Sequence, residues 1–531
     1  MHRAHRFIMG FLLRAFATAA ASEASAAGER TSVQTDSGKV CGTVAEGVAA
    51  FKGIPFAQPP VGALRWRAPQ PVKPWDGIRD AVAFSPNPMQ PAPSEGSALL
   101  TLASAGFSED CLYLNVWRPA TTESKPLPVM VWIHAGGLVR RGASMYPGDA
   151  LARQGIVFVS FNYRLGRLGF FAHPALAREA PDDLHGNYGY MDQIAALQWV
   201  QRNIAAFGGD PKNVTIAGES AGAGSVLVLM TSPMTRGLFR RAILESPNMP
   251  GARACAGAMR ELASAESIAV QYAHSLGIEG DDEVMLAKLR AVPAHTLVDG
   301  TEHYLLSIFG GPEIPGLSHS IIDGRLVVEA PEAALRAGKQ TMVPVIVGAN
   351  DHDLAASPAQ TKDALFAQFG PLASQARKLY DPNGDVSFED LSQAIVADEI
   401  IIEPSRNLAE LMTKADQSAY FYRFSYVPEA LHERRHGATH GAEIPFAFDT
   451  VSALFKDKAS EADLAMAGTI SGYWVDFVKA GDPNGGGRPA WPHFNLATGE
   501  VLNITSAGVA FGPDPLKARL DLWRAVWEQG R

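Results

Sequence analysis

Cysteine is scarce in this chain of 531 residues. Only three are present, at Cys41, Cys111 and Cys255, and they lie too far apart for a disulfide framework or a cysteine-based metal cluster. The odd number and the wide spacing indicate free, buried thiols. The sequence therefore predicts neither a disulfide-stapled fold nor a bound metal, and it shows no motif for a cofactor.

Positive charge is also in short supply. The chain has 46 Lys and Arg against 55 Asp and Glu, which gives a formal net charge of −9. Such a balance offers no general attraction for nucleic acid or anionic lipid, so we expect neither as a partner. Hydrophobic residues at 47% and charged residues at 19% are ordinary values for a folded chain with a large core.

Long apolar runs are missing beyond the N-terminus, so no transmembrane helix is predicted. At the N-terminus, basic residues precede an apolar run over 7–21, and Ala24-Ser25-Ala26 follows it. This pattern is typical of a signal peptide, and we expect residues 1–26 to direct secretion or transport to the periplasm. A charged residue interrupts the run, so the alternative is a disordered leader, or a start at Met9, on a cytoplasmic protein.

One stretch organises the rest of the chain. Residues 214–225 begin as an apolar, β-branched run and then break into small residues around Ser220. Gly218 and Gly222 flank the serine at the two places where a side chain would collide in a sharp turn. Because the preceding residues 198–211 indicate a helix, a glycine stop and a turn, the pattern predicts a strand, a tight elbow at Ser220 and a helix.

The remaining pattern favours an α/β fold with a large, mostly parallel central sheet flanked by helices. Buried-strand runs at 128–133, 156–161 and 342–347 alternate with helical segments. A small β-meander is expected over 31–56. We predict a single domain over 27–531, with helical insertions around 255–340 and 355–420.

Several blocks of the chain resemble the type-B carboxylesterase/lipase family, the cholinesterase-like branch of the α/β-hydrolases. The resemblance is carried by residues 51–66, 109–115, 162–170, 186–210 and 218–222. It implies an α/β-hydrolase fold and a serine carboxylesterase that forms an acyl-enzyme, with the catalytic residues in the chain order serine, acid, histidine. It also implies two ion pairs near the site, Arg65 with Glu109 and Arg164 with Asp192.

The resemblance assigns the catalytic roles residue by residue. Ser220 is the nucleophile, and His440, in a motif at 439–446, is the general base. Asp353 is the acid that orients the imidazole, although the family usually has glutamate and then glycine at this turn, and Asp351 is the alternative. We expect a pKa near or somewhat below neutrality for the His440 base.

The oxyanion hole is implied at the backbone N–H groups of Gly136, Gly137 and Ala221. Two arginines, Arg140 and Arg141, follow in this loop before Gly142, where the family usually has an aromatic residue and one position fewer before the glycine. Arginines there favour acidic acyl or alcohol groups, or simply form part of the solvated surface.

The function classes that compete with a carboxylesterase share its fold. Residues 85–107 lack both a tryptophan and the family's first cysteine, which argues against a cholinesterase. A lipase or an amide or carbamate hydrolase uses the same chemistry, and activity on emulsified long-chain esters distinguishes the lipase. A non-catalytic binding protein of this fold is disfavoured because Ser220, Asp353 and His440 are all present.

Overall fold

A computed structural model describes residues 29–92, 106–121, 125–247, 253–254, 264–301, 314–354, 357 and 359–529. The proposed leader over 1–26, Cys255 and much of the 85–107 loop lie outside these residues.

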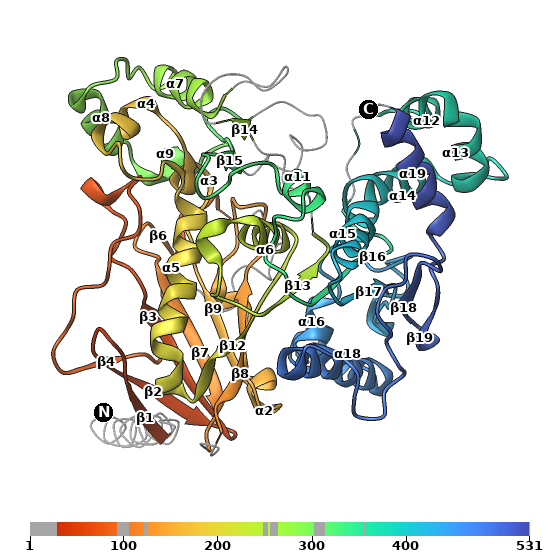
Figure 1. The fold of residues 1–531 in the computed structure, drawn as a ribbon, viewed down its shortest axis with the longest axis horizontal. Helices are drawn as coiled ribbons and strands as arrows, with labels where there is room; N and C mark the ends of the chain where they lie inside the picture. Colours follow the sequence, from red (N-terminus) through yellow and green to blue (C-terminus); the bar gives the residue numbers. More distant parts are fainter. Residues whose placement is uncertain are drawn as a thin grey trace, which may run out of the picture.

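One 13-stranded sheet runs through the described chain in the order β1-β2-β3-β7-β9-β8-β12-β13-β16-β17-β18-β19, with β4 beside β2 (Figure 1). Neighbouring strands are parallel from β9 to β18 and antiparallel at both ends. The strands are β1 (Glu29–Gln34), β2 (Lys39–Ala45), β3 (Val48–Pro55), β4 (Ile78–Asp80), β7 (Tyr113–Pro119), β8 (Leu127–Ile133), β9 (Val157–Phe161), β12 (Gly209–Glu219), β13 (Arg241–Glu245), β16 (Val345–Asn350), β17 (Ala419–Phe424), β18 (Glu500–Thr505) and β19 (Gly508–Pro513).

Helices cover both faces of this sheet. Val131 and Ile216 point into a core shared with α5 (Tyr188–Asn203) and α6 (Ala221–Thr231). Their neighbours Trp132 and Ala217 point into a second core shared with α18 (Glu461–Ala480). Successive side chains of a strand alternate between the two faces, so a strand that is buried on both faces reads as a continuous apolar run. This explains the uninterrupted hydrophobic sequence of β8.

Helices lie along most of the described chain. Those of the C-terminal part, α12, α13, α14 and α19, gather on the side of the molecule opposite β1 (Figure 1). The helices are α2 (Asp149–Arg153), α3 (Gly166–Gly169), α4 (Pro174–Glu179), α5 (Tyr188–Asn203), α6 (Ala221–Thr231), α7 (Ala265–Ser275), α8 (Glu283–Arg290), α9 (Ala294–Val298), α11 (Pro331–Arg336), α12 (Lys362–Ala367), α13 (Ala373–Tyr380), α14 (Phe388–Ala397), α15 (Glu403–Lys414), α16 (Ile444–Ala447), α17 (Val451–Phe455), α18 (Glu461–Ala480) and α19 (Lys517–Gln529). Three two-stranded pairs join β5 (Asn87–Pro88) to β6 (Phe107–Ser108), β10 (Phe170–Phe171) to β11 (Gly186–Asn187), and β14 (Arg253–Ala254) to β15 (Ile321–Ile322).

The structure refines two predictions about strands. The predicted meander forms as β1, β2 and β3, but it is the edge of the main sheet and not a separate one, because β3 pairs with β7. The strand predicted from Met342 begins instead at Val345. Pro344 has no N–H to donate to a strand ladder, and Met342 is exposed.

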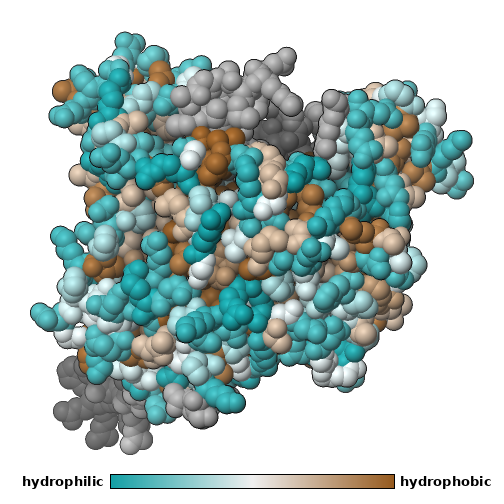
Figure 2. Space-filling model, viewed as in Figure 1, coloured by the Kyte–Doolittle hydropathy of each residue, from teal (hydrophilic) through white to brown (hydrophobic). Residues whose placement is uncertain are grey.

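The face of the molecule seen in Figure 2 interleaves hydrophilic and hydrophobic residues without one dominant apolar area. Within the described residues, each helix is too short or too polar to span a membrane.

The sheet register sets the position of the site. Gly218 of β12 pairs with Ile133 at the end of β8, and Glu219 pairs with Glu245 at the end of β13. Glu245 in turn pairs with Gly348 of β16. Parallel strands therefore end together at one edge, where side chains from four separate parts of the chain meet.

Candidate active site

Ser220 occupies the predicted elbow between β12 and α6. Its backbone has φ 56° and ψ −123°, in the region of positive φ that is strained for a residue with a side chain. The Ser220 N–H donates to the Glu245 carbonyl at 2.9 Å, and the Ser220 carbonyl accepts from the Gly224 N–H at 2.8 Å. These bonds hold the strained residue between strand and helix, with 8% of its surface exposed.

Both flanking glycines are required by close packing. A Cβ on Gly222 would lie 2.1 Å from the carbonyl oxygen of Ile133, and a Cβ on Gly218 would lie 2.6 Å from the carbonyl carbon of Gly222. Contacts this short with backbone atoms cannot be relieved by moving a side chain. The elbow therefore needs glycine at both positions, as the sequence predicts.

The predicted oxyanion-hole residues lie at two strand ends. Gly136 and Gly137 follow β8 with φ values of 109° and 67°, and Ala221 is the first residue of α6. Within the described chain, the N–H groups of these three residues donate no hydrogen bond. They are free to bind an oxyanion, beside a helix N-terminus that favours negative charge.

His440 and Asp353 are in direct contact, because the Nδ1 of the imidazole is hydrogen-bonded to Oδ1 of the carboxylate. Asp353 also accepts hydrogen bonds from the Leu354 N–H at 2.9 Å, the Asn350 N–H at 3.0 Å and the Ser246 hydroxyl at 2.6 Å. Burial alone would raise the pKa of Asp353, but the charge and hydrogen bond of His440 outweigh burial and lower it. The carboxylate therefore stays ionised and fixes the ring.

The alternative acid, Asp351, points elsewhere. One of its carboxylate oxygens accepts a hydrogen bond from the Ala438 N–H at 2.8 Å, two residues before His440. The His352 N–H donates to the Ala438 carbonyl at 3.1 Å. Asp351 thus braces the backbone before His440 and contacts the side chain of His352, at 3.4 Å, whereas the His440 ring pairs with Asp353.

The Nε2 atom of His440 faces Glu219. It lies 3.1 Å from Oε1 of this carboxylate, and in the described chain no hydrogen bond joins His440 to the Ser220 hydroxyl. Burial alone would lower the pKa of His440, but Glu219, Asp353 and Glu443 together raise it to about 9. This value corrects the expectation of a pKa near or below neutrality, because the sequence did not predict the second carboxylate at Nε2.

Two further buried glutamates lie near the triad, and neither was predicted from the sequence. Glu443 accepts a hydrogen bond from the Asn350 side chain at 2.5 Å, and Glu245 accepts one from the Trp474 indole at 2.7 Å. Burial, reinforced by Glu219 and Asp353, raises the pKa of Glu443 to about 8. The only sequence signal for Glu443 is its place in the 439–446 motif.

Arg141 is not a solvated surface residue. Its side chain is 29% exposed and turns inward, with Nη1 3.4 Å from the Tyr146 hydroxyl and 3.9 Å from Oε2 of Glu219. This orientation corrects the surface interpretation for Arg141. Arg140, the neighbouring residue, is partly buried.

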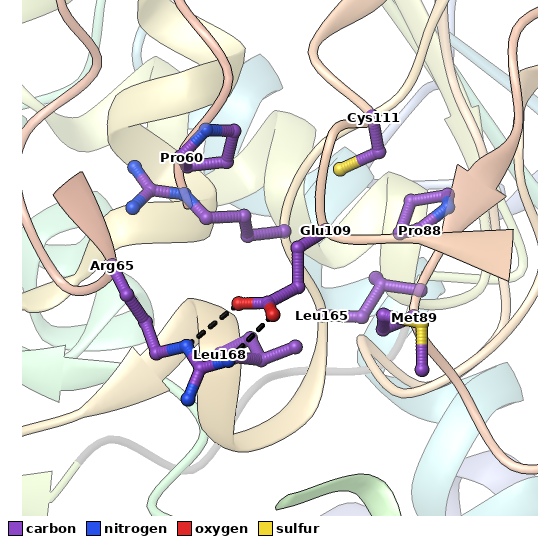
Figure 3. Close-up of a pocket in the computed structure, with 9 residues that line it drawn as sticks. Pro60, Arg65, Pro88, Met89, Glu109, Cys111, Leu165 and Leu168 are labelled. Carbon is purple, nitrogen blue, oxygen red and sulfur yellow. Dashed lines mark hydrogen bonds and ion pairs between the residues drawn. The ribbon is translucent and has the colours of Figure 1, made fainter. Parts of the chain in front are cut away.

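The two predicted ion pairs are confirmed. Arg65 binds Glu109 through two hydrogen bonds of 2.7 and 2.5 Å, beside a cavity of about 10 Å³ lined by Pro88, Cys111 and Leu165 (Figure 3). Such a cavity has room for about one water molecule.

Arg164 donates two side-chain hydrogen bonds of 2.8 and 2.7 Å to Asp192, and both side chains are buried. Removing one partner of such a buried pair costs about 3–5 kcal/mol, because the remaining charge is left buried without a partner.

Cys41 and Cys111 are buried free thiols, as predicted. No group of three or more His, Cys, Asp or Glu side chains in the described part of the chain is arranged to hold a metal ion.

The parallel sheet, the serine elbow at a strand end and the contact between the acid and the histidine define an α/β-hydrolase. Two solved structures of PNB esterase superpose on this chain with TM-scores of 0.77 and 0.76, at 32% and 31% identity, covering 93% of this chain and 99% of theirs. The chain belongs to the Carboxylesterase family, whose sequence profile matches residues 29–369 and 361–523.

Curated relatives agree with this assignment. Fumonisin B1 esterase of Sphingopyxis macrogoltabida is 35% identical over 505 residues, which cover 91% of this chain and 88% of the relative. Liver carboxylesterase 1 of Oryctolagus cuniculus is 35% identical over 514 residues, covering 88% of each chain. The protein is thus a hydrolase that acts on carboxylic ester bonds.

Proposed function

We propose that this carboxylesterase cleaves small-molecule esters through an acyl-enzyme on Ser220, with His440 as general base and Asp353 as the orienting acid. The observation that carries the proposal is the hydrogen-bonded pair of Asp353 and His440 beside the strained elbow at Ser220. Relatives named as esterases of fumonisin B1 and cocaine support small-molecule esters as the substrate class.

In the proposed reaction, Ser220 Oγ attacks the ester carbonyl while Nε2 of His440 takes its proton. For this step Nε2 must come within hydrogen-bond reach of the Ser220 hydroxyl, and catalytic hydrogen bonds that are long or poorly aligned in a free enzyme often shorten when substrate binds. The oxyanion receives hydrogen bonds from the N–H groups of Gly136, Gly137 and Ala221. His440 then protonates the leaving alcohol, and water repeats the sequence on the acyl-enzyme.

Steady-state kinetics of three variants tests these roles. Ser220→Ala should lower kcat by about 10⁶-fold. Asp353→Asn should lower it by about 10⁴-fold because the amide favours the wrong imidazole tautomer. Asp351→Asn is the matched control, with a much smaller loss expected because its carboxylate contacts the Ala438 N–H and the His352 side chain and not His440. A large loss of kcat in Asp351→Asn together with a small loss in Asp353→Asn would contradict the assignment of the acid.

We also propose that residues 1–26 are a signal peptide, which places the mature enzyme in the periplasm or outside the cell. The support is the basic, apolar and small-residue pattern of this segment. Mass spectrometry of the enzyme purified from its native source should give a chain that starts at Ala27. A chain that retains Met1 would contradict cleavage.

A further inference from the structure

A single buried carboxylate lies between the imidazole of the triad and a guanidinium. Oε1 of Glu219 is 3.1 Å from Nε2 of His440, and Oε2 is 3.9 Å from Nη1 of Arg141. The Glu219 side chain is fully buried, and within the described chain neither of its oxygens has a hydrogen bond. Its charge is therefore balanced only by the two cationic groups that face it.

We propose that Arg141 is a positioning residue that balances part of the Glu219 charge and so weakens the attraction of Glu219 for the His440 imidazole, which must serve Ser220. This inference rests on the proposed roles of Ser220 and His440. Without the guanidinium, Glu219 would hold the protonated ring at Nε2, which is the atom that must accept the serine proton. With the guanidinium in place, the same carboxylate has a permanent partner that carries no transferable proton at neutral pH.

The backbone conformation of Arg141 is unusual and is held by Gln90. Its φ of 75° lies in the left-handed region, which favours glycine and is strained for arginine. Gln90 holds it there from both sides, since its Oε1 accepts from the Arg141 N–H and its Nε2 donates to the Arg141 carbonyl, each at 2.8 Å. Arg141 is thus a strained residue that two hydrogen bonds hold in the oxyanion loop, the segment after β8 that contains Gly136 and Gly137. Strain that is maintained in this way indicates a function for the side chain.

The charges around His440 show why such a balance is needed. Three carboxylates from separate parts of the chain carry charge that favours the protonated imidazole: Asp353 after β16, Glu219 at the end of β12 and Glu443 before α16. Arg141 and Tyr146, which follow β8 in the chain, interact with the Glu219 carboxylate. Glu245 of β13 and Tyr422 of β17 lie behind these carboxylates. Arg141 is the one permanent cation in this set of groups, and it lies on the Nε2 side of the ring.

The expected effect is a shift in the pH dependence of catalysis. Removing the guanidinium removes a charge that disfavours the imidazolium, so the pKa of His440 should rise. Because Glu219 lies between the guanidinium and the imidazole, we expect the pKa of His440 to rise by about one unit. The ascending limb of kcat/KM against pH should therefore move upward by about one unit, with about a tenfold loss of activity at pH 7.

Pre-steady-state and steady-state pH profiles of Arg141→Gly test the proposal. Glycine suits the positive φ and so offsets part of the stability that is lost when Glu219 loses a buried partner. The Tm of each variant is measured as well, and the profiles are recorded well below it, which separates chemistry from stability. Arg141→Lys keeps a cation and should keep the apparent pKa within a few tenths of a unit of the wild-type value. The double variant Arg141→Gly with Glu219→Gln has no charge at position 219 to be balanced. Its ascending limb of kcat/KM should therefore lie at lower pH than that of Arg141→Gly alone.

Arg153→Gln provides a matched control for the loss of one positive charge. Its guanidinium is exposed and faces Glu46 in the turn between β2 and β3, so its removal should not move the pH profile. An unshifted profile in Arg141→Gly overturns the proposal, as does a loss confined to the KM of acidic esters, which would make Arg141 a substrate-binding residue. Full activity of Ser220→Ala would instead overturn the proposed function itself.

Discussion

At the scale of single residues, the proposed role of His440 as general base predicts how activity depends on pH. The base acts only as neutral imidazole, and its pKa is raised to about 9. We expect kcat/KM to rise as pH increases from 6 toward 9, and to level off only above that range. A profile of kcat/KM for a soluble ester checks this, and a plateau that begins below pH 6.5 would contradict it.

The same pKa has a consequence for stability. Because the pKa of His440 is higher in the folded protein than its ordinary value of 6.5, the protonated ring stabilises the fold. This contribution is complete below pH 6.5 and is lost as pH rises through 9. Activity and this part of the stability therefore change in opposite directions across the alkaline range.

The individual site residues differ in how far the sequence could predict them. Ser220 and His440 sit in short motifs, and Asp353 follows a strand in the expected register. The contact between Glu219 and His440 could not be predicted, because it joins segments that lie far apart in the sequence. The inward orientation of Arg141 could not be predicted either, because it depends on a strained backbone angle. Local patterns carry no information about such contacts.

At the scale of elements, the elbow depends on the close approach of β8 to the start of α6. We expect Gly222→Ala to abolish activity, and to lower the yield of folded protein, because its Cβ would lie 2.1 Å from the Ile133 carbonyl oxygen. The control is Gly468→Ala in α18, where nothing lies within 4 Å of the added carbon. Thermal unfolding and esterase assays of both variants check the contrast, and an active, stable Gly222 variant would contradict the packing argument.

The strands of the core were predictable because strands buried on both faces read as continuous apolar runs. The pairing of these strands with one another was harder to predict. Nothing in residues 31–56 indicates that the meander pairs with β7, since pairing at an edge depends on which strand the fold brings alongside. The predicted start of β16 was also inexact, because the apolar run begins before Pro344 and the hydrogen-bonded strand begins after it.

At the scale of the whole molecule, the parallel sheet brings together residues that are distant in sequence. Ile133, Glu219, Glu245 and Asn350 end four adjacent strands, so the oxyanion loop, the nucleophile and the acid turn share one edge. The order of strands along the sheet follows from the fold of the entire chain and not from any one motif. This arrangement brings the residues of the proposed catalytic site together.

The central claim is that Ser220 is an activated nucleophile in a working hydrolase. Treatment with an organophosphonate probe, followed by digestion and peptide mass spectrometry, tests it most directly. We expect one phosphonyl group per chain, located on Ser220, with parallel loss of esterase activity and no labelling of the Ser220→Ala variant. An unlabelled Ser220 in a folded protein, or labelling at another serine, would contradict the account.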